Sequence, residues 1–207
     1  MLWRHGRTAW NDEGRFQGQI DVGLDEVGRE QADRASRLLA AMPPDVIVSS
    51  DLVRARDTAE PLAALTGVHV RVDEGLRETF AGDWQGMLGS EIRAKDGARL
   101  GAWRAGADIR PGGGETRTEI ADRAEAALYR GLAEVPDAGV IVLVTHGGTA
   151  RSLIGRLLGL PVVSWQVLGG LANCSWSVLE EWGERSWRLT EHNAGTLPEP
   201  VMGDDGT

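Results

Sequence analysis

The sequence predicts an α/β fold: a three-layer αβα sandwich with a mostly parallel central sheet, an antiparallel edge and a small inserted cap. Short β-branched runs at 46–49 and 140–145 lack a helical period, which is typical of strands buried on both faces of a parallel sheet. Each run leads toward a helix-like segment. Strands that alternate with helices imply right-handed crossovers, with helices covering both faces of the sheet.

Four segments are expected to be helical. Asp25 can cap a helix that ends at Pro43, and residues 53–65 form a second helix in which Pro61 introduces a kink. Apolar residues at helical spacing define the buried faces. These are Val27, Ala35, Leu38, Leu39 and Met42 in the first helix, Ile120, Ala124, Ala127, Leu128 and Leu132 in the third, and Leu153, Ile154, Leu157 and Leu158 in the fourth, which Gly159 closes.

The last third of the chain closes the sheet. Residues 175–179 and 187–190, joined by a turn at 183–185, predict an antiparallel pair at its edge. We expect one domain over residues 1–196, followed by a disordered tail at 197–207. Only three residues precede Arg4, so we expect either a clipped first strand or a start further upstream.

Residues 84–115 differ from the rest of the chain. They are rich in glycine, with short helical pieces around 90–95 and 98–103, followed by Pro111-Gly112-Gly113-Gly114. We interpret this segment as a cap inserted over the sheet.

Composition and charge exclude several classes of protein. With 207 residues, 42% of them hydrophobic, the chain can hold a full core. A net charge of −9 argues against nucleic-acid binding. No run of 18 apolar residues and no signal sequence is evident, so we expect no membrane partner and a cytoplasmic location. The single Cys174 excludes an internal disulfide and a zinc site built from several thiolates.

Two histidines stand at the carboxyl ends of expected strands, where open α/β sheets bind ligands. His5 and His146 are each followed directly by glycine, which permits a sharp turn. The helix after His146 would direct its free amides into the same crevice, as an anion seat. Arg4 adjoins His5 and Arg54 follows the second strand, and guanidinium groups match the oxygens of a phosphoryl group. This arrangement favours a phosphorylated ligand.

These motifs resemble the histidine phosphatase superfamily, also called phosphoglycerate-mutase-like, over nearly the whole chain. They stand in the family's order: Arg4-His5-Gly6, Asn11, Gln17-Gly18, Asp21, Leu24, the run from Ser49 to Ala55, Leu76-Arg77-Glu78, Gly82-Asp83-Trp84-Gln85-Gly86 and Thr145-His146-Gly147-Gly148. Gln85 replaces the glutamate that many members carry, and we do not expect this change to abolish activity.

The resemblance implies a metal-independent phosphomonoesterase that needs no cofactor and forms a phosphohistidine on His5. A neutral imidazole is a competent nucleophile near neutral pH. Phosphoryl transfer depends on positioning and charge stabilisation. The implied phosphate ligands are Arg4, Asn11, Gln17, Arg54 and His146. Weaker likenesses, such as Gly113-Gly114-Glu115 and Asn173-Cys174-Ser175-Trp176, suggest a small phosphorylated metabolite such as glucosyl-3-phosphoglycerate.

Glu78 is the implied proton donor to the leaving alkoxide, and afterwards the base for the hydrolytic water. The like charge of a bound phosphate dianion favours a protonated carboxyl nearby. The residues alone favour another interpretation, in which Glu78 forms an ion pair with its neighbour Arg77.

Two further functions stay open: a cofactor-dependent phosphoglycerate mutase and a non-catalytic binder of phosphorylated ligands. The segment from Glu78 to Glu115 is shorter than expected for a mutase insertion, which favours hydrolysis. Several cap and strand residues are open to more than one role, and a homodimer is left open. Arg99, Arg104 and Arg110 could bind a second phosphate or a carboxylate, Trp84 and Trp103 could reach the crevice, and His69 and His192 are expected to be structural.

Overall fold

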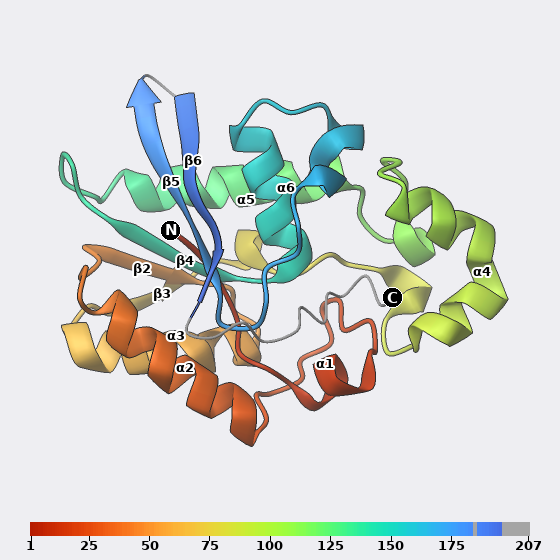
Figure 1. Cartoon of the computed structure of the whole chain (residues 1–207), viewed down its shortest axis with the longest axis horizontal. Helices are drawn as coiled ribbons and strands as arrows, with labels where there is room; N and C mark the ends of the chain where they lie inside the picture. Colours follow the sequence, from red (N-terminus) through yellow and green to blue (C-terminus); the bar gives the residue numbers. More distant parts are fainter. Residues whose placement is uncertain (184–185, 196–207) are drawn as a thin grey trace.

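The computed structural model describes residues 1–183 and 186–195. Within them the chain forms a six-stranded sheet of order β3-β2-β4-β1-β5-β6 (Figure 1). The strands are β1 (Leu2–Arg4), β2 (Val46–Ser49), β3 (Val70–Val72), β4 (Ile141–Thr145), β5 (Trp176–Gly183) and β6 (Ser186–Ala194). The first four strands in this order run parallel, and β5 and β6 add the antiparallel edge. The mixed sheet confirms the predicted fold class.

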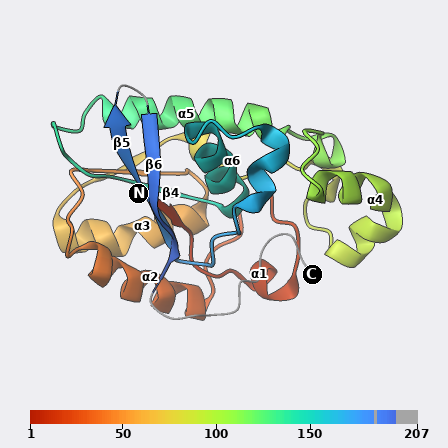
Figure 2. The ribbon, with the colours of Figure 1, turned by 45° about the horizontal axis from the view of Figure 1, so that its top comes forward.

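Helices cover both faces of the sheet, so the fold has three layers (Figures 1 and 2). Helices α2 (Glu26–Leu39) and α3 (Val53–Thr66) share one core cluster with Ile47 and Val144. Helices α5 (Arg117–Leu132) and α6 (Gly147–Leu157) share another with Val48 and Leu143. Successive residues of β2 and β4 therefore point to opposite layers, as the pleat of a strand requires.

The predicted buried face of α2 is partly wrong. Asp25 does cap the helix, because its side chain accepts from the Gly28 amide at 2.7 Å. However, Val27, Leu38 and Met42 are 36%, 50% and 53% exposed, and the helix ends at Leu39 rather than at Pro43. The buried face is instead built mainly from small residues, among them Gly28, Ala32 and Ala35. Small side chains let the helix lie close to its neighbours, so the larger apolar residues fall outside the contact.

The other predicted helices are confirmed. All the expected apolar residues of the third and fourth predicted helices except Ile120 belong to one core cluster, in which Leu132, Leu157 and Leu158 are only partly buried. Ile120 is buried as well but is not part of this cluster. Helix α3 continues through Pro61 to Thr66 and ends at Gly67, where φ is 74°. A short helix α1 (Ala9–Glu13) follows β1.

The segment between Glu78 and Glu115 forms a body beside the sheet (Figure 1). Helix α4 (Gly89–Arg104) contains a non-helical residue at Asp96, which divides it into the two expected pieces. Its core contains Phe16, Trp84, Ile92 and Trp103, among others, and is separate from the two clusters of the sheet. Short 3-10 helices η1, η2, η3 and η4 span Glu74–Leu76, Gly82–Trp84, Pro111–Gly113 and Val162–Val167.

The domain boundaries stay predictions. The expected tail at 197–207 and part of the turn at 183–185 lie outside the described residues. The antiparallel pair is longer than expected, because β5 extends to Gly183 and β6 begins at Ser186. In the described part of the chain, no helix is both long and apolar enough to cross a membrane.

Candidate active site

Two neighbouring strands bring the predicted histidines together. Arg4 of β1 lies opposite Thr145 of β4, so the next residues, His5 and His146, leave the sheet side by side. Their ring centroids are 5.0 Å apart, and both residues are almost fully buried. Residues 141 positions apart in the sequence thus meet at one edge of the sheet.

Hydrogen bonds fix the orientation of the His5 ring. Nδ1 lies 2.7 Å from the Gly6 carbonyl oxygen, which can only accept, so Nδ1 carries the proton and Nε2 keeps its lone pair. The main-chain oxygen of His5 accepts from the Asn173 side chain and the Cys174 amide. Burial lowers the pKa of His5 well below 6.5, and the charges of Arg54 and Arg4 lower it further. His5 is therefore neutral and has a free basic nitrogen.

The glycine after His5 is required by close packing. A Cβ on Gly6 would lie 2.4 Å from the carbonyl oxygen of Gly28 in α2. The Gly6 amide donates to Thr58 Oγ1 of α3 at 2.9 Å. The turn that carries His5 is thus held between two helices and has no room for a side chain.

Arg4 and Arg54 are buried beside the histidines. Arg4 Nη1 donates to the Leu171 carbonyl at 2.6 Å, and Arg54 donates to the carbonyls of Gly18 and Ile20. Carbonyl groups hold a guanidinium in place without neutralising its charge. Arg54 lies in the first turn of α3, whose first amide donates to the Asp21 carboxylate at 2.7 Å.

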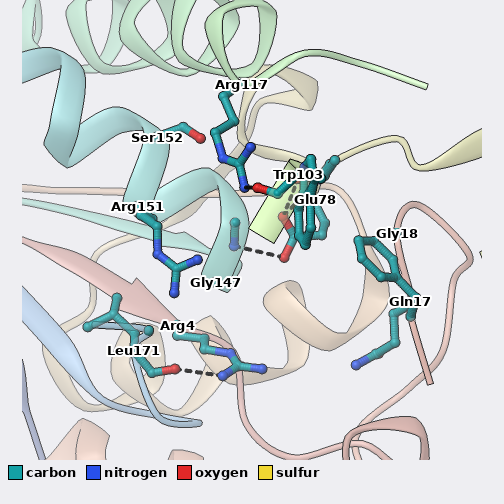
Figure 3. Close-up of a pocket in the computed structure, with 14 residues that line it drawn as sticks. Arg4, Gln17, Gly18, Glu78, Trp103, Arg117, Gly147, Arg151, Ser152 and Leu171 are labelled. Atoms are coloured by element: carbon teal, nitrogen blue, oxygen red, sulfur yellow. Dashed lines mark hydrogen bonds between the residues drawn. The ribbon is translucent and has the colours of Figure 1, made fainter. Parts of the chain in front are cut away.

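Glu78 lies at the amino end of α6 (Figure 3). Its Oε2 accepts from the Gly148 amide at 3.1 Å, and its Oε1 accepts from the amides of Thr149 and Thr79. We expected these helix amides to form an anion seat for the ligand, and that expectation is wrong for two of them because the Glu78 carboxylate occupies them. A helix amino terminus binds whichever carboxylate or phosphate lies nearest to it.

The proposed ion pair between Glu78 and Arg77 does not form in the described part of the chain. Arg77 pairs with Asp51, with Nη2 2.5 Å from Oδ2, and more distantly with Glu74. The Glu78 side chain turns instead toward the pocket, which it lines together with Arg4. This leaves the carboxyl group facing the place where a ligand would bind.

His146 is buried next to these groups. Among residues 1–183 and 186–195, neither of its ring nitrogens has a hydrogen-bond partner. Burial lowers its pKa well below 6.5, and the charge of Arg54 is the next cause. A buried ring without partners is costly, and an anionic oxygen of a ligand could satisfy it.

The two predicted amide ligands are placed differently. Gln17 lines the pocket, and its Oε1 accepts from Thr8 Oγ1 at 3.0 Å. Because the side-chain oxygen of Gln17 is used in this way, its amide nitrogen points toward the pocket (Figure 3). Asn11 is buried and uses its Oδ1 to accept from the Thr8 amide and from Asn173 Nδ2. Like the buried His5, Arg54 and His146, Asn11 is not among the described residues that line the pocket.

The sequence analysis did not identify two arginines that line the pocket, and it selected three other arginines as ligands. Arg117 at the start of α5 and Arg151 in α6 line the pocket, whereas Arg99, Arg104 and Arg110 are not among its described lining residues. Arg151 follows His146 by five positions, and residues at that spacing do not share a helix face, so the spacing did not mark it. Nothing in the sequence marks Arg117. Of the two tryptophans, Trp103 lines the pocket and Trp84 is buried in the core around α4.

A third missed arginine supports the loop that carries Glu78. Arg123 of α5 donates to the carbonyls of Gly75, Arg77 and Glu78. Its guanidinium also pairs with Glu115, at 2.9 Å between Nε and Oε1. These contacts fix the main chain of the loop that carries Glu78.

Neither of the remaining histidines is among the described residues that line the pocket. His69 is exposed just before β3, and His192 bonds to Ser177 Oγ and the Gly169 carbonyl. In the described ranges, no group of three His, Cys, Asp or Glu side chains is arranged to hold a metal ion.

The fold and the paired histidines define a known class. Residues 1–195 match the model of the histidine phosphatase superfamily, branch 1, and the chain belongs to this family. Among particular proteins, it is 47% identical over 182 residues to a glucosyl-3-phosphoglycerate phosphatase of Mycolicibacterium vanbaalenii, covering 84% of this chain and 80% of the relative. It is 44% identical over 209 residues to the phosphatase of the same name from Mycobacterium tuberculosis, covering 94% and 93%.

Solved structures agree with this assignment. A mycobacterial glucosyl-3-phosphoglycerate phosphatase in complex with VO3 superimposes with a TM-score of 0.88 at 46% identity, over 94% of this chain and 98% of that one. The chain is therefore similar to these phosphatases over nearly its whole length.

Proposed function

We propose that this chain is a metal-independent phosphomonoesterase that works through a phosphohistidine at His5. The observation that carries the proposal is the buried pair of neutral histidines, 5.0 Å apart, beside the guanidinium groups of Arg4 and Arg54. A neutral imidazole supplies the nucleophile, and the fixed positive charges stabilise the transferring phosphoryl group.

In the first step, His5 Nε2 donates its lone pair to phosphorus, and the bond between phosphorus and the ester oxygen breaks. Glu78 gives its proton to the leaving oxygen, so the alcohol departs neutral. Arg4, Arg54 and His146 stabilise the phosphoryl oxygens, with Gln17 and Asn11 as further ligands.

In the second step, a water oxygen attacks phosphorus and the bond to Nε2 breaks. Glu78 accepts the proton of the water, which restores its starting form. Inorganic phosphate leaves, and His5 is again neutral. Over the two steps one water is consumed and one alcohol is released, so atoms and protons balance.

We further propose glucosyl-3-phosphoglycerate as a substrate, in the cytoplasm. Relatives that are 44–47% identical carry this substrate in their names. Trp103 lines the pocket, and an aromatic face suits a sugar ring. A homodimer stays a prediction.

The test is hydrolysis of p-nitrophenyl phosphate in EDTA, by the parent and by His5→Ala. We expect turnover by the parent and none by the variant. A parent without turnover would favour the non-catalytic binder. A panel with glucosyl-3-phosphoglycerate and 3-phosphoglycerate then separates hydrolysis from isomerisation, because a mutase would return 2-phosphoglycerate instead of free phosphate.

A further inference from the structure

The loop that carries Glu78 is fixed largely by side chains. Residues 77–81 follow η1 without regular secondary structure. Even so, each main-chain carbonyl from Gly75 to Glu78 accepts a hydrogen bond from a side chain. The donors are Arg123 for Gly75, Arg77 and Glu78, and Thr145 for Leu76. Because an unpaired main-chain group is costly inside a protein, the course of this loop depends on these donors.

One guanidinium supplies most of these hydrogen bonds. Arg123 Nη1 donates to the carbonyls of Gly75 and Arg77 at 2.8 and 2.6 Å. Nη2 donates to the Glu78 carbonyl at 3.0 Å. Nε and Nη2 also donate to the two carboxylate oxygens of Glu115, at 2.9 and 3.0 Å. Each N–H group of this guanidinium therefore has an acceptor, and the rigid fork of an arginine is required to reach all of them.

Glu115 orients the Arg123 side chain and is itself bonded to the same loop. Its Oε2 accepts from the Phe80 amide at 2.8 Å, and its own amide donates to the Phe80 carbonyl at 2.8 Å. The side chains of Arg123 and Glu115 are only 20% and 23% exposed. Solvent and salt therefore weaken this ion pair less than they weaken a pair on the surface.

A second side chain holds the same carbonyl. Gln19 Nε2 donates to the Glu78 carbonyl at 3.0 Å, and the Gln19 amide donates to Gln85 Oε1 at 2.8 Å. Gln85 lies at the beginning of the α4 segment (residues 84–115), and Glu115 lies at its end. Each end of this segment thus contacts a residue that donates to the Glu78 carbonyl.

We propose that Arg123, oriented by Glu115, is a positioning residue for Glu78. The role rests on the proposed function, because Glu78 is the acid of that reaction. Arg123 is not among the described residues that line the pocket, so it acts through Glu78 and not on the ligand. A general acid works only within hydrogen-bond reach of the oxygen that it protonates. A displacement of about 1 Å can lower a rate by roughly a hundredfold, so a loop that shifts would disable the acid and leave His5 in place.

The test variant is Arg123→Lys, which keeps the positive charge but loses the fork. Its matched control is Arg130→Lys. Arg130 lies on the same helix and also donates to both carboxylate oxygens of one residue, Asp73, at 2.9 and 2.8 Å, but Asp73 caps η1. Glu115→Gln is a second variant, which leaves Arg123 in place and weakens the ion pair that orients it.

The readout is the ratio of kcat/KM for an alkyl phosphate to kcat/KM for p-nitrophenyl phosphate. The alkyl phosphate is the one that the parent hydrolyses best in the panel above. An alkoxide needs the proton of Glu78, whereas p-nitrophenolate leaves unaided. We expect Arg123→Lys to lower the ratio by roughly ten- to a hundredfold and Glu115→Gln to lower it severalfold. Arg130→Lys should leave it unchanged.

A double variant shows whether the effect passes through Glu78. When Arg123→Lys is added to Glu78→Gln, the ratio should stay where Glu78→Gln alone sets it, because residues that act through one group are not additive. Thermal melts of all variants accompany the kinetics. A merely structural role of Arg123 would lower both rates by the same factor and leave the ratio unchanged.

Two results would overturn the positioning role. One is a ratio in Arg123→Lys that equals the ratio in Arg130→Lys, and if Arg123→Lys does not fold, an unchanged ratio in Glu115→Gln has the same meaning. The other is a further fall of the ratio in the double variant. A parent that hydrolyses neither substrate would instead contradict the proposed function itself, so the two failures are distinguishable.

Discussion

At the scale of single residues, Glu78 is the group that donates a proton in the first step of the proposed reaction and accepts one in the second. Three backbone amides hold its carboxylate, and Arg123 holds the main chain behind it. Replacement by glutamine keeps the size of the side chain but removes the exchangeable proton. It also places the glutamine NH2 group opposite a backbone N–H that donates to a carboxylate oxygen in the parent, so that one hydrogen bond is lost.

We expect Glu78→Gln to affect substrates according to their leaving groups. Turnover of an alkyl phosphate, whose alkoxide needs a proton, should fall by roughly 10²–10⁴-fold. The first step with p-nitrophenyl phosphate should suffer much less, because p-nitrophenolate leaves unaided. Pre-steady-state release of nitrophenol and alcohol measures this step directly. Equal losses for both substrates would contradict the role of Glu78 as an acid.

The burial of His146 makes the free energy of unfolding depend on pH. Its native pKa lies well below the ordinary 6.5, so below that pH the unfolded chain takes up a proton that the native ring refuses. The free energy of unfolding therefore falls as the pH drops below 6.5, by up to about 1.4 kcal/mol per pH unit for this group. Above that range both states are neutral and the group contributes nothing.

Replacing His146 should flatten this dependence. We expect His146→Gln to unfold with a shallower pH slope than the parent between pH 6.5 and the acid limit of folding, and with a similar slope at higher pH. Urea denaturation at a series of pH values measures both slopes. Unchanged acid sensitivity would show that His146 titrates normally in the native protein.

At the scale of elements, the close approach of α2 to the turn after β1 sets the position of His5. Gly6→Ala would place a methyl group 2.4 Å from the carbonyl oxygen of Gly28, a backbone atom that cannot rotate away as a flexible side chain could. We expect a loss of about 1–3 kcal/mol in stability and a large loss of activity.

The matched control is Gly101→Ala in α4, an exposed helical position with nothing within 4 Å. That change should stabilise the protein by about 0.5–1 kcal/mol. Thermal and urea melts compare the two, and a neutral Gly6→Ala would disprove the packing argument.

How well the sequence predicts a helix or strand depends on which side chains form its buried face. Strands β2 and β4 are apolar on both faces, so their runs locate them within a residue or two. The buried face of α2 escaped prediction because glycine and alanine make the contact, while larger apolar residues such as Leu38 stay exposed. Periodicity weights side chains by hydrophobicity, whereas close packing selects them by size.

At the scale of the whole molecule, the sheet order gathers the site. The carboxyl ends of β1, β2 and β4 are adjacent, so His5, His146 and the start of α3 with Arg54 converge although the sequence separates them widely. That convergence could be inferred from parallel topology alone. The use of the α6 amides by Glu78 and the entry of Arg117 into the pocket could not, because both depend on how loops pack against the sheet.

The account stands most directly on a covalent bond between His5 and phosphorus. The measurement is mass spectrometry of the protein mixed with excess substrate and quenched in alkali, where phosphohistidine survives. We predict the added mass of one phosphoryl group on the peptide that contains His5, lost on acid treatment and absent from His5→Ala. A parent that turns over substrate under the same conditions without this adduct, or a His5→Ala variant that carries it, would contradict the account.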